Sequence, residues 1–275
     1  MKLQFLGTAA AEGFPSFYCK CDACKEAMSK GGRNIRSRCQ SLLDDTILLD
    51  FGPDTYYHMV TYKVPLESIH HILITHNHAD HLQTDDLYYR REGYAAVIEE
   101  EPLYVYGTKP VYDRVNETAS KERFVNILKA VEITPFVPFK VKDYDVMPLK
   151  ASHAPISGPV LYLISKDNKT MLYAHDTGLF CKETWDELEK LEKPLDLITL
   201  DCTAGILRGW DLTHLSFDVF LRVIDEMKEK NIVDEHTIVI ANHFSHNGKA
   251  TYDKMVEVAK EHNVIISYDG MVVEF

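Results

Sequence analysis

Short apolar runs recur along the whole chain, separated by polar turns and by longer amphipathic segments. Many of the runs are rich in β-branched or aromatic residues, which is typical of strands. They predict strands over residues 3–6, 46–50, 72–74, 103–107, 131–141, 144–149, 160–164, 170–173, 195–201 and 237–241, one starting near Cys39, and two within 264–275.

Segments with helical periodicity lie between these runs. They predict helices over residues 54–62, 83–100, 109–129, 182–192, about 212–229 and 251–262. Strands outnumber helices and mostly lack βαβ spacing, which favours two sheets packed face to face with helices outside. No linker, long repeat or low-complexity tract interrupts the pattern, so we expect one domain over residues 1–275.

Composition narrows the class of protein. The 275 residues are 45% hydrophobic and 26% charged, with a net charge of −12. A broad basic face for nucleic acid is therefore not expected, because phosphate binding needs clustered lysine and arginine. No apolar run reaches membrane-spanning length, and the N-terminal residues are too polar for a secretory signal, so the expected location is the cytoplasm. Cysteines there are expected to be ligands or buried thiols.

The segment Thr75–His81 carries four potential metal ligands in the pattern H-x-H-x-D-H. It follows the apolar run 72–74, so the ligands lie on a loop that leaves a buried strand. Alternate side chains of an extended segment point the same way, so His76 and His78 can share one cation. After the chain turns, Asp80 and His81 can face a second cation. Imidazole and carboxylate groups suit zinc, manganese or iron.

Further candidate ligands follow other predicted strands: His153, Asp176 and His243. Strand ends at one edge of packed sheets converge, so these residues can meet the first cluster. Two-metal hydrolytic sites need such a set, with about three ligands on each ion and a carboxylate that bridges them. The pattern therefore predicts a hydrolytic centre with two divalent cations.

A second ligand cluster, C-x-C-x-x-C, is formed by Cys19, Cys21 and Cys24. A structural zinc site needs four ligands, so a fourth must come from elsewhere in the chain, and Cys39 is one candidate. Three inert thiols or a redox-active C-x-x-C are the alternatives. The redox reading is weakened by the extra cysteine and by the lack of a predicted helix start at this point.

Together these motifs resemble the metallo-β-lactamase superfamily, over nearly the whole chain. The resemblance implies an αββα sandwich of α/β (α+β) class. It also implies that His76, His78 and His153 bind one metal, that Asp80, His81 and His243 bind the other, and that Asp176 bridges them.

The N-terminal residues Leu6-Gly7-Thr8, Gly13-x-Pro15 and C-x-C-x-x-C are similar to a narrower branch. That branch comprises phosphodiesterases associated with carbon–phosphorus bond cleavage, which hydrolyse phosphoribosyl cyclic phosphate. The resemblance implies a structural zinc held by the three clustered cysteines and by His246. The alternatives are that His246 is a solvated loop histidine and that Cys39 or Cys202 is the fourth ligand. The resemblance also implies a small, preferably cyclic, phosphodiester as the substrate.

Two residues are expected to act in the reaction. His214 precedes a helix in a segment that resembles the superfamily motif assisting phosphoester cleavage, so it can donate a proton or bind a phosphate oxygen. A capping or packing role is its alternative. Asp80 could orient the attacking water besides binding metal. The remaining histidines are expected to be structural: His58, His70, His71, His175, His236 and His262.

Other functions compete with this hypothesis. A tRNA 3′-processing nuclease shares the metal site, but the chain lacks a Gly/Lys-rich insertion and is acidic. A di-iron redox protein of this fold has glutamate in place of the second histidine, where this chain has His78. A metal-binding accessory protein without turnover is a third alternative. The sequence leaves the oligomeric state open, with a homodimer among the options.

Overall fold

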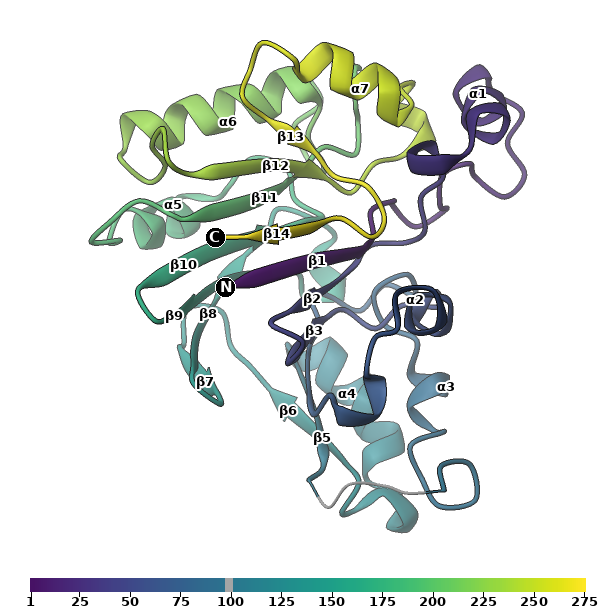
Figure 1. Cartoon of the computed structure of the whole chain (residues 1–275). Coiled ribbons are helices and arrows are strands. Elements are labelled where there is room, and N and C mark those ends of the chain that lie inside the picture. Colours follow the sequence, from purple (N-terminus) through teal and green to yellow (C-terminus); the bar gives the residue numbers. More distant parts are fainter. Residues whose placement is uncertain (97–100) are drawn as a thin grey trace.

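The computed structural model describes residues 1–96 and 101–275. Two sheets pack face to face, and helices cover both outer faces (Figure 1). This arrangement confirms the predicted αββα sandwich.

Each sheet mixes parallel and antiparallel pairs. In spatial order, the first sheet contains β14 (Val272–Glu274), β1 (Lys2–Gly7), β2 (Gln40–Leu43), β3 (Ile47–Leu49), β4 (His71–Leu73), β5 (Leu103–Gly107) and β6 (Leu128–Glu132). The second contains β13 (Ile265–Ile266), β12 (Ile238–Asn242), β11 (Leu197–Asp201), β10 (Lys169–Ala174), β9 (Val160–Lys166), β8 (Tyr144–Lys150) and β7 (Phe139–Val141).

The helices lie outside the two sheets. The second sheet is covered by α5 (Lys182–Leu188), α6 (Phe217–Glu229) and α7 (Tyr252–Ala259). Beside the first sheet lie α2 (Thr55–Tyr62), α3 (Thr84–Leu87) and α4 (Lys109–Ala119), while α1 (Asp22–Lys30) projects at one end. Short 3₁₀ turns are η1 (Gly32–Asn34), η2 (Leu66–Ser68), η3 (Glu122–Phe124), η4 (Pro155–Ser157) and η5 (His246–Gly248).

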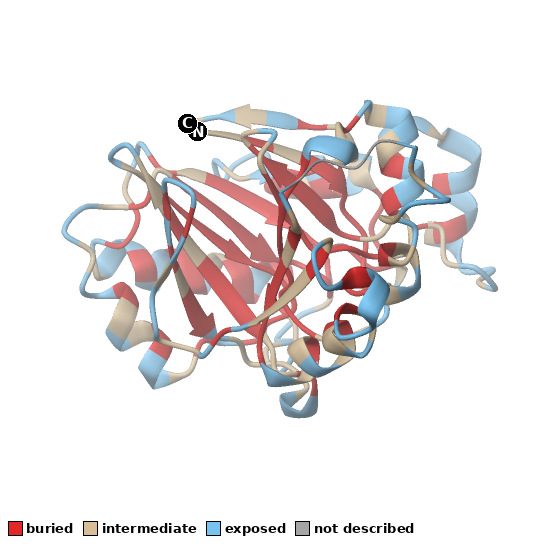
Figure 2. Cartoon of the chain, turned by 90° about the horizontal axis from the view of Figure 1, so that it is seen from below, coloured by how far each residue is buried: buried red, intermediate tan, exposed pale blue. Residues whose placement is uncertain are grey.

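Both faces of the central strands are buried, which explains why their sequences are continuous apolar runs. In β10, Met171 and Tyr173 belong to the layer between the sheets, whereas Leu172 and Ala174 pack toward the helices. Figure 2 shows buried strands in the middle of the molecule and exposed residues mainly on the helices and loops. The two-sided burial makes the strands a rigid base for the loops at their ends.

Three sequence predictions are wrong in detail. Instead of a helix over residues 83–100, the described part contains α3 and turns, and residues 97–100 lie outside it. The helix expected over residues 109–129 ends at Ala119, because Phe124 and Leu128 turn into the core under α4. This makes β5-α4-β6 a parallel crossover unit, and the predicted strand 131–141 is divided between β6 and β7 in different sheets.

Other helix boundaries also differ. The helices expected at 182–192, 212–229 and 251–262 do form, as α5, α6 and α7, but each is shorter than expected. The helix α1, which was not predicted, begins directly after Cys21. The two terminal strands do form, but β13 joins the second sheet and β14 the first.

Among residues 1–96 and 101–275, none of the helices combines the length and apolarity needed to cross a membrane.

A buried hydrogen bond joins the two sheets at the start of the histidine-rich loop. The hydroxyl of Tyr162 on β9 donates to the carbonyl of Ile74, just after β4, at 2.7 Å. We predict that Tyr162→Phe lowers the free energy of unfolding by about 1–2 kcal/mol, because it leaves a buried carbonyl without this donor. Urea denaturation measures this loss. Tyr89→Phe, at a 55% exposed tyrosine, is the matched control, and equal losses in the two variants would contradict the prediction.

Candidate metal centre

The candidate ligands converge at one edge of the sandwich. The strands β10, β11 and β12 run parallel, so their carboxyl ends carry Asp176, Asp201 and His243 side by side. The loop after β4 and the segment containing His153 after β8 reach the same place. The structure therefore brings together all seven side chains predicted from the sequence.

The first group of donors consists of three imidazoles. Nδ1 of His78 lies 2.9 Å from Nε2 of His76 and 3.3 Å from Nε2 of His153. Burial lowers the pKa of His76 well below its ordinary value and also lowers that of His153. Both rings are therefore held in the neutral form that binds metal ions.

The second group combines imidazoles and carboxylates. Nε2 of His81 lies 3.0 Å from Oδ2 of Asp80 and 2.9 Å from Oδ2 of Asp176. The same Asp176 oxygen is 2.9 Å from Nε2 of His243, and Oδ1 of Asp176 is 3.6 Å from Nε2 of His153. Asp176 thus lies between the two groups, where a bridging carboxylate would be needed.

The outward-facing nitrogens of four histidines are fixed by the protein. Nδ1 of His81 contacts Asp50 at 2.7 Å, and Nδ1 of His243 contacts the Thr203 hydroxyl at 2.8 Å. His76 and His153 have the same arrangement, with Nδ1 beside Oγ1 of Thr75 (3.0 Å) and the Thr213 carbonyl (3.3 Å). Such contacts fix ring orientation and tautomer, and they leave Nε2 directed at the centre.

Three buried donor atoms that face the middle of the centre indicate that it fits metal ions. Nε2 of His81, Oδ2 of Asp176 and Nε2 of His243 are buried, and none of them meets hydrogen-bond criteria with any residue that the structure describes, although the Asp176 oxygen lies 2.9 Å from both nitrogens. Unpaired buried polar atoms are costly, and here they face one another at contact distance. Divalent cations would satisfy all three, so the donor set fits a metal centre.

Electrostatics within the centre favour charged groups. Burial would raise the pKa of Asp176, but the neighbouring His243 and His81 hold it well below its ordinary value. Burial would lower the pKa of His81, but Asp80, Asp50 and Asp176 raise it well above its ordinary value. The centre therefore holds its carboxylates ionised and places excess negative charge around His81, which a cation can neutralise.

The backbone is also unusual at the strand ends. Asp50, Asp176 and His243 have φ angles of 68°, 50° and 62°, in the left-handed region that non-glycine residues seldom occupy. Asp50 directly follows β3 and His243 directly follows β12, whereas one residue, His175, separates Asp176 from the end of β10. This geometry turns the side chains toward the centre at a local energetic cost, as is common at functional sites.

His214 lies beside the centre rather than within it. Its Nδ1 is 3.0 Å from Oδ2 of Asp201 and 3.9 Å from Oδ1 of Asp176. Burial would lower its pKa, but Asp201 and the other carboxylates raise the pKa to about 9. The structure thus places this imidazole where it can hold a proton near the cavity.

Asp50, Asp201 and Thr203, for which the sequence predicted no role, contact histidines of the centre from outside it. Their only sequence signal is that each follows or ends an apolar strand. Asp201 accepts hydrogen bonds from the Thr203 hydroxyl (3.0 Å) and the Leu215 backbone (2.9 Å) while facing His214. His175, predicted to be structural, is buried with Nδ1 3.2 Å from Sγ of Cys39.

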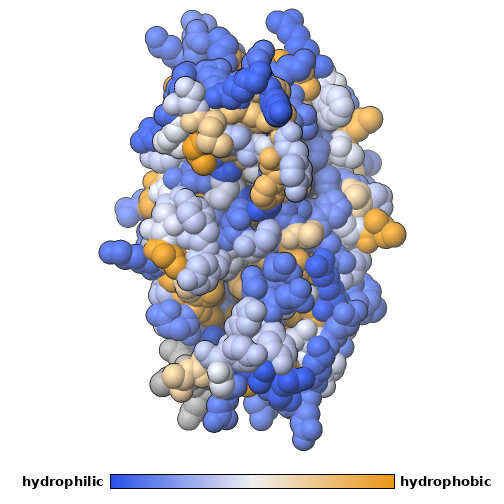
Figure 3. Space-filling view, turned by 90° about the vertical axis from the view of Figure 1, so that its right-hand side faces the viewer, coloured by the Kyte–Doolittle hydropathy of each residue, from blue (hydrophilic) through white to orange (hydrophobic). Residues whose placement is uncertain are grey.

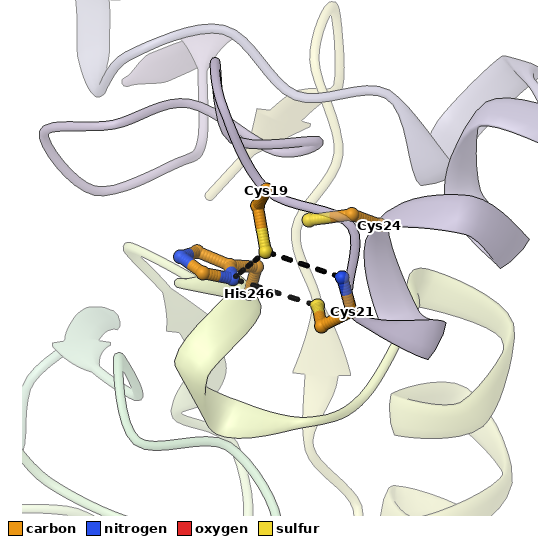
Figure 4. Close-up of side chains that lie close together, drawn as sticks. All are labelled: Cys19, Cys21, Cys24 and His246. Carbon is orange, nitrogen blue, oxygen red and sulfur yellow. Dashed lines mark hydrogen bonds between the residues drawn. The ribbon is translucent and has the colours of Figure 1, made fainter.

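The cysteine cluster forms a separate group next to the centre. Cys19, Cys21, Cys24 and His246 offer ligand atoms that all lie within 4.8 Å of one another. Nδ1 of His246 is 3.3 Å from Sγ of Cys19 and 3.6 Å from Sγ of Cys21 (Figure 4). Three sulfurs and one imidazole nitrogen match a tetrahedral zinc site.

The rival fourth ligands lie elsewhere, because Cys39 is buried beside Tyr173 and His175, and Cys202 is buried at the end of β11. The cluster also adjoins a helix start that was not predicted from the sequence, because α1 begins directly after Cys21. Burial alone would raise the pKa of the Cys21 thiol, but His246 and neighbouring groups lower this pKa to about 6. Burial raises the pKa of the Cys24 thiol to about 12.

A cavity of about 410 Å³ opens over the paired donor groups. Its lining includes five candidate ligands and His214: His78, Asp80, His153, Asp176, His214 and His243. The cavity can hold a small molecule in contact with the candidate metal ligands.

The face of the molecule bearing α1 and α2 is mostly hydrophilic, with separate hydrophobic spots rather than one continuous apolar patch (Figure 3).

Comparison with known proteins identifies the family. The sequence profile described as Beta-lactamase superfamily domain matches residues 45–237. Coenzyme PQQ synthesis protein B from Acinetobacter baumannii is 24% identical over 327 aligned positions, covering 100% of both chains. Octanoyltransferase from Porphyromonas gingivalis is 29% identical over 171 residues, 58% of this chain and 32% of that protein. The chain thus spans about a third of that relative.

Solved structures share the fold. A diphosphatase from the PhnP family superposes with a TM-score of 0.76 at 20% identity, covering 100% of this chain and 96% of the other. Zn(2+)-bound PqqB from Methylobacterium extorquens gives 0.73 at 16% identity, with 100% of both chains covered. Human tRNase Z, short form, gives 0.66 at 16% identity, covering 100% of this chain and 99% of the other.

We predict that Asp176→Asn lowers the divalent metal content of the paired donor groups by about one ion per chain, because a neutral amide bridges two cations poorly. Elemental analysis after zinc or manganese loading measures the change. Asp225→Asn, at an exposed aspartate of α6, is the matched control. Full metal content in the Asp176 variant would show that this carboxylate is not a bridge.

A separate prediction concerns the cysteine cluster. Cys21→Ser is expected to remove about one zinc per chain and to lower the melting temperature, because a four-ligand site loses one thiolate. Cys181→Ser, outside the cluster, controls for the loss of a thiol. Identical zinc content in both variants would contradict a zinc site here.

Proposed function

We propose that this protein hydrolyses small phosphodiesters, cyclic ones included, at a pair of divalent cations. The chain belongs to the metallo-β-lactamase superfamily of metal-dependent hydrolases. The observation that carries the proposal is the buried contact of Asp176 with both His81 and His243, beside the His76–His78–His153 group. Phosphoribosyl cyclic phosphate is one substrate of this class.

The donors divide into two ligand sets. His76, His78 and His153 would hold one cation, Asp80, His81 and His243 would hold the other, and Asp176 would contact both. Such sets of nitrogen and oxygen donors accept zinc, manganese or iron. A pair of cations at this position supplies a water of lowered pKa and neutralises charge on the phosphoryl oxygens.

The protein's own residues would direct the reaction. Asp80, which lines the cavity, would orient the attacking water, which releases a proton to solvent as its oxygen forms the new bond to phosphorus. As the ester P–O bond breaks, His214 gives its Nε2 proton to the departing oxygen, or donates a hydrogen bond to a phosphoryl oxygen. Asp201 holds His214 through Nδ1, which leaves Nε2 free for either role.

The cysteine cluster would carry a structural zinc in this proposal. Cys19, Cys21, Cys24 and His246 hold it close to the centre, because His246 lies three residues after His243 on the same loop. Zinc there would tie the N-terminal segment to the loop that follows β12.

The charge of the chain bears on the alternatives. The likeness to human tRNase Z supports cleavage of a phosphodiester. A net charge of −12 disfavours a long RNA substrate, which is held mainly through its phosphates. An accessory protein without turnover remains the alternative from another class.

The experiment is an assay of the metal-loaded protein against bis-p-nitrophenyl phosphate, nucleoside cyclic phosphates, precursor tRNA and a thioester. Hydrolysis of the small phosphodiesters, with little cleavage of tRNA at physiological salt, supports the proposal. Turnover of tRNA alone or thioester alone contradicts it, and no turnover of any compound favours the accessory role.

The role of His214 predicts a dependence on the leaving group. His214→Asn should lower kcat about 10²-fold for a phosphodiester with an alkoxide leaving group, because the general acid is lost. The loss should be smaller for p-nitrophenolate, which departs without a proton. His236→Asn, at an exposed histidine, is the control. Equal losses for both leaving groups would indicate that His214 does not act as the acid.

A further inference from the structure

A second cavity, of about 420 Å³, lies apart from the candidate metal centre. Its lining comes from η1, the segment that follows η1, the helix α2 and the turn between β13 and β14. In the part of the chain that the structure describes, this cavity and the cavity over the paired donor groups have no lining residue in common. Its volume is in the range of small-molecule sites in proteins, so it can hold a ligand separately from the metal centre.

Two arginines without ion-pair partners line this cavity. Nη1 of Arg33 donates to the Tyr252 hydroxyl at 3.3 Å. Nη1 of Arg36 donates to the Thr8 hydroxyl and to the Ser267 carbonyl, both at 2.7 Å. All of these acceptors are uncharged, and neither guanidinium forms an ion pair with any residue that the structure describes. This is unexpected in a chain with 42 acidic and 30 basic side chains.

Arg36 is the buried member of the pair, at 3% exposure. Its guanidinium lies over the Phe244 ring, with Cζ 4.3 Å from the ring centre, and its Nε and Nη2 have no hydrogen-bond partner among the described residues. Burial lowers the pKa of Arg36 to about 10, so the side chain stays charged at neutral pH. A buried cation without a counter-ion is costly, and an aromatic face offsets only part of that cost. An anion in the cavity would reduce the remainder.

The one carboxylate in the lining, Asp269, already has partners within the protein. Its Oδ1 accepts from the Thr8 hydroxyl at 2.6 Å, and its Oδ2 accepts from the Ser37 N–H and hydroxyl at 2.5 and 2.6 Å. Even with Asp269 ionised, the lining carries two positive charges and one negative charge. The cavity therefore favours an anion over a cation.

Carboxylates on the flanking elements are also paired. Asp253 of α7, which contacts η1, forms an ion pair with Lys30 at 3.1 Å. Asp54, which precedes α2, forms an ion pair with Arg38 at 2.9 Å. These ion pairs leave the two arginines of the cavity available to a ligand.

Aromatic side chains supply the rest of the binding surface. Cζ of Arg33 lies 3.8 Å from the centre of the Tyr268 ring, so the guanidinium is held against a flat surface. The helix α2 contributes Tyr57, which is 53% exposed, and Tyr62. Tyrosine faces and a planar guanidinium are both suited to stack on a flat ring.

We propose that this cavity is a second binding site, which takes a small molecule whose flat ring carries an oxyanion, either a phosphate monoester or a carboxylate. Arg33 binds the oxyanion directly, because its forked N–H groups match two oxygens. Arg36 adds its charge from the buried side, and the tyrosines contact the ring. The site does not depend on the proposed hydrolytic function.

Calorimetric titration of the full metal-loaded chain tests this site with adenosine 5′-phosphate, indole-3-carboxylate and uncharged adenosine. At least one anion should bind about tenfold more tightly than adenosine, and the tighter of the two identifies the source of the oxyanion. Arg33→Gln should weaken binding of that anion about tenfold, because a neutral amide replaces the fork. Arg222→Gln, at an exposed arginine of α6, is the matched control and should bind like the wild-type protein.

A second variant separates this cavity from the metal centre. Ile35 lines the cavity and is 39% exposed, so Ile35→Glu can add a negative charge there without disturbing the core. It should weaken binding of the anion at least tenfold and leave metal content and any hydrolysis of bis-p-nitrophenyl phosphate unchanged. A crystal soaked with the anion should show it within hydrogen-bond distance of Arg33.

Three results would overturn the proposal. They are equal affinities for adenosine and both anions, an unchanged affinity in both the Arg33 and the Ile35 variants, and a soaked crystal in which the anion contacts only the metal centre. The titration needs no turnover, so a protein that hydrolyses no phosphodiester would contradict the proposed function and still give a result for this site.

Discussion

The contact of one buried carboxylate with two buried imidazoles determines how the rest of this structure can be understood. Asp176 touches both His81 and His243 through a single oxygen, and among the described residues none of these inward-facing atoms meets hydrogen-bond criteria with any partner. A protein that buried these groups for packing alone would lose stability, because unpaired polar atoms are costly in an interior. Metal ions between the donors remove that cost, so the fold and its cations are best regarded as one unit.

The scaffold explains how such a cluster can be held. Apolar layers on both faces of β10, β11 and β12 fix the strands, and their parallel carboxyl ends fix the relative positions of Asp176, Asp201 and His243. The left-handed backbone at Asp176 and His243 then turns these side chains inward. Asp50 contacts His81 and Asp201 contacts His214, so the protein itself orients these imidazoles at the candidate centre.

Much of this arrangement could be predicted from the sequence, because the candidate ligands either lie close together in the chain or directly follow apolar runs that predict strands. The spacing of His76, His78, Asp80 and His81 placed four donors on one loop, and apolar strands before Asp176 and His243 predicted their convergence. His246 came only from family resemblance, since nothing local links it to cysteines more than two hundred residues away. The outer roles of Asp50 and Asp201 depend on tertiary contacts that no local pattern encodes.

The errors in secondary structure have a similar origin. Charged residues after Ala119 resemble a continuing helix, but burial of Phe124 and Leu128 ends it. The apolar residues of 131–141 resemble one strand, yet the two ends join different sheets. In both segments tertiary packing overrides local propensity.

The central claim, that Asp176 bridges a pair of cations, is tested most directly by anomalous diffraction from crystals of the metal-loaded protein. The account predicts two cation peaks roughly 4 Å apart, both within bonding distance of Asp176, with His76, His78 and His153 on one and Asp80, His81 and His243 on the other. A single peak, or two peaks that Asp176 does not join, would contradict it.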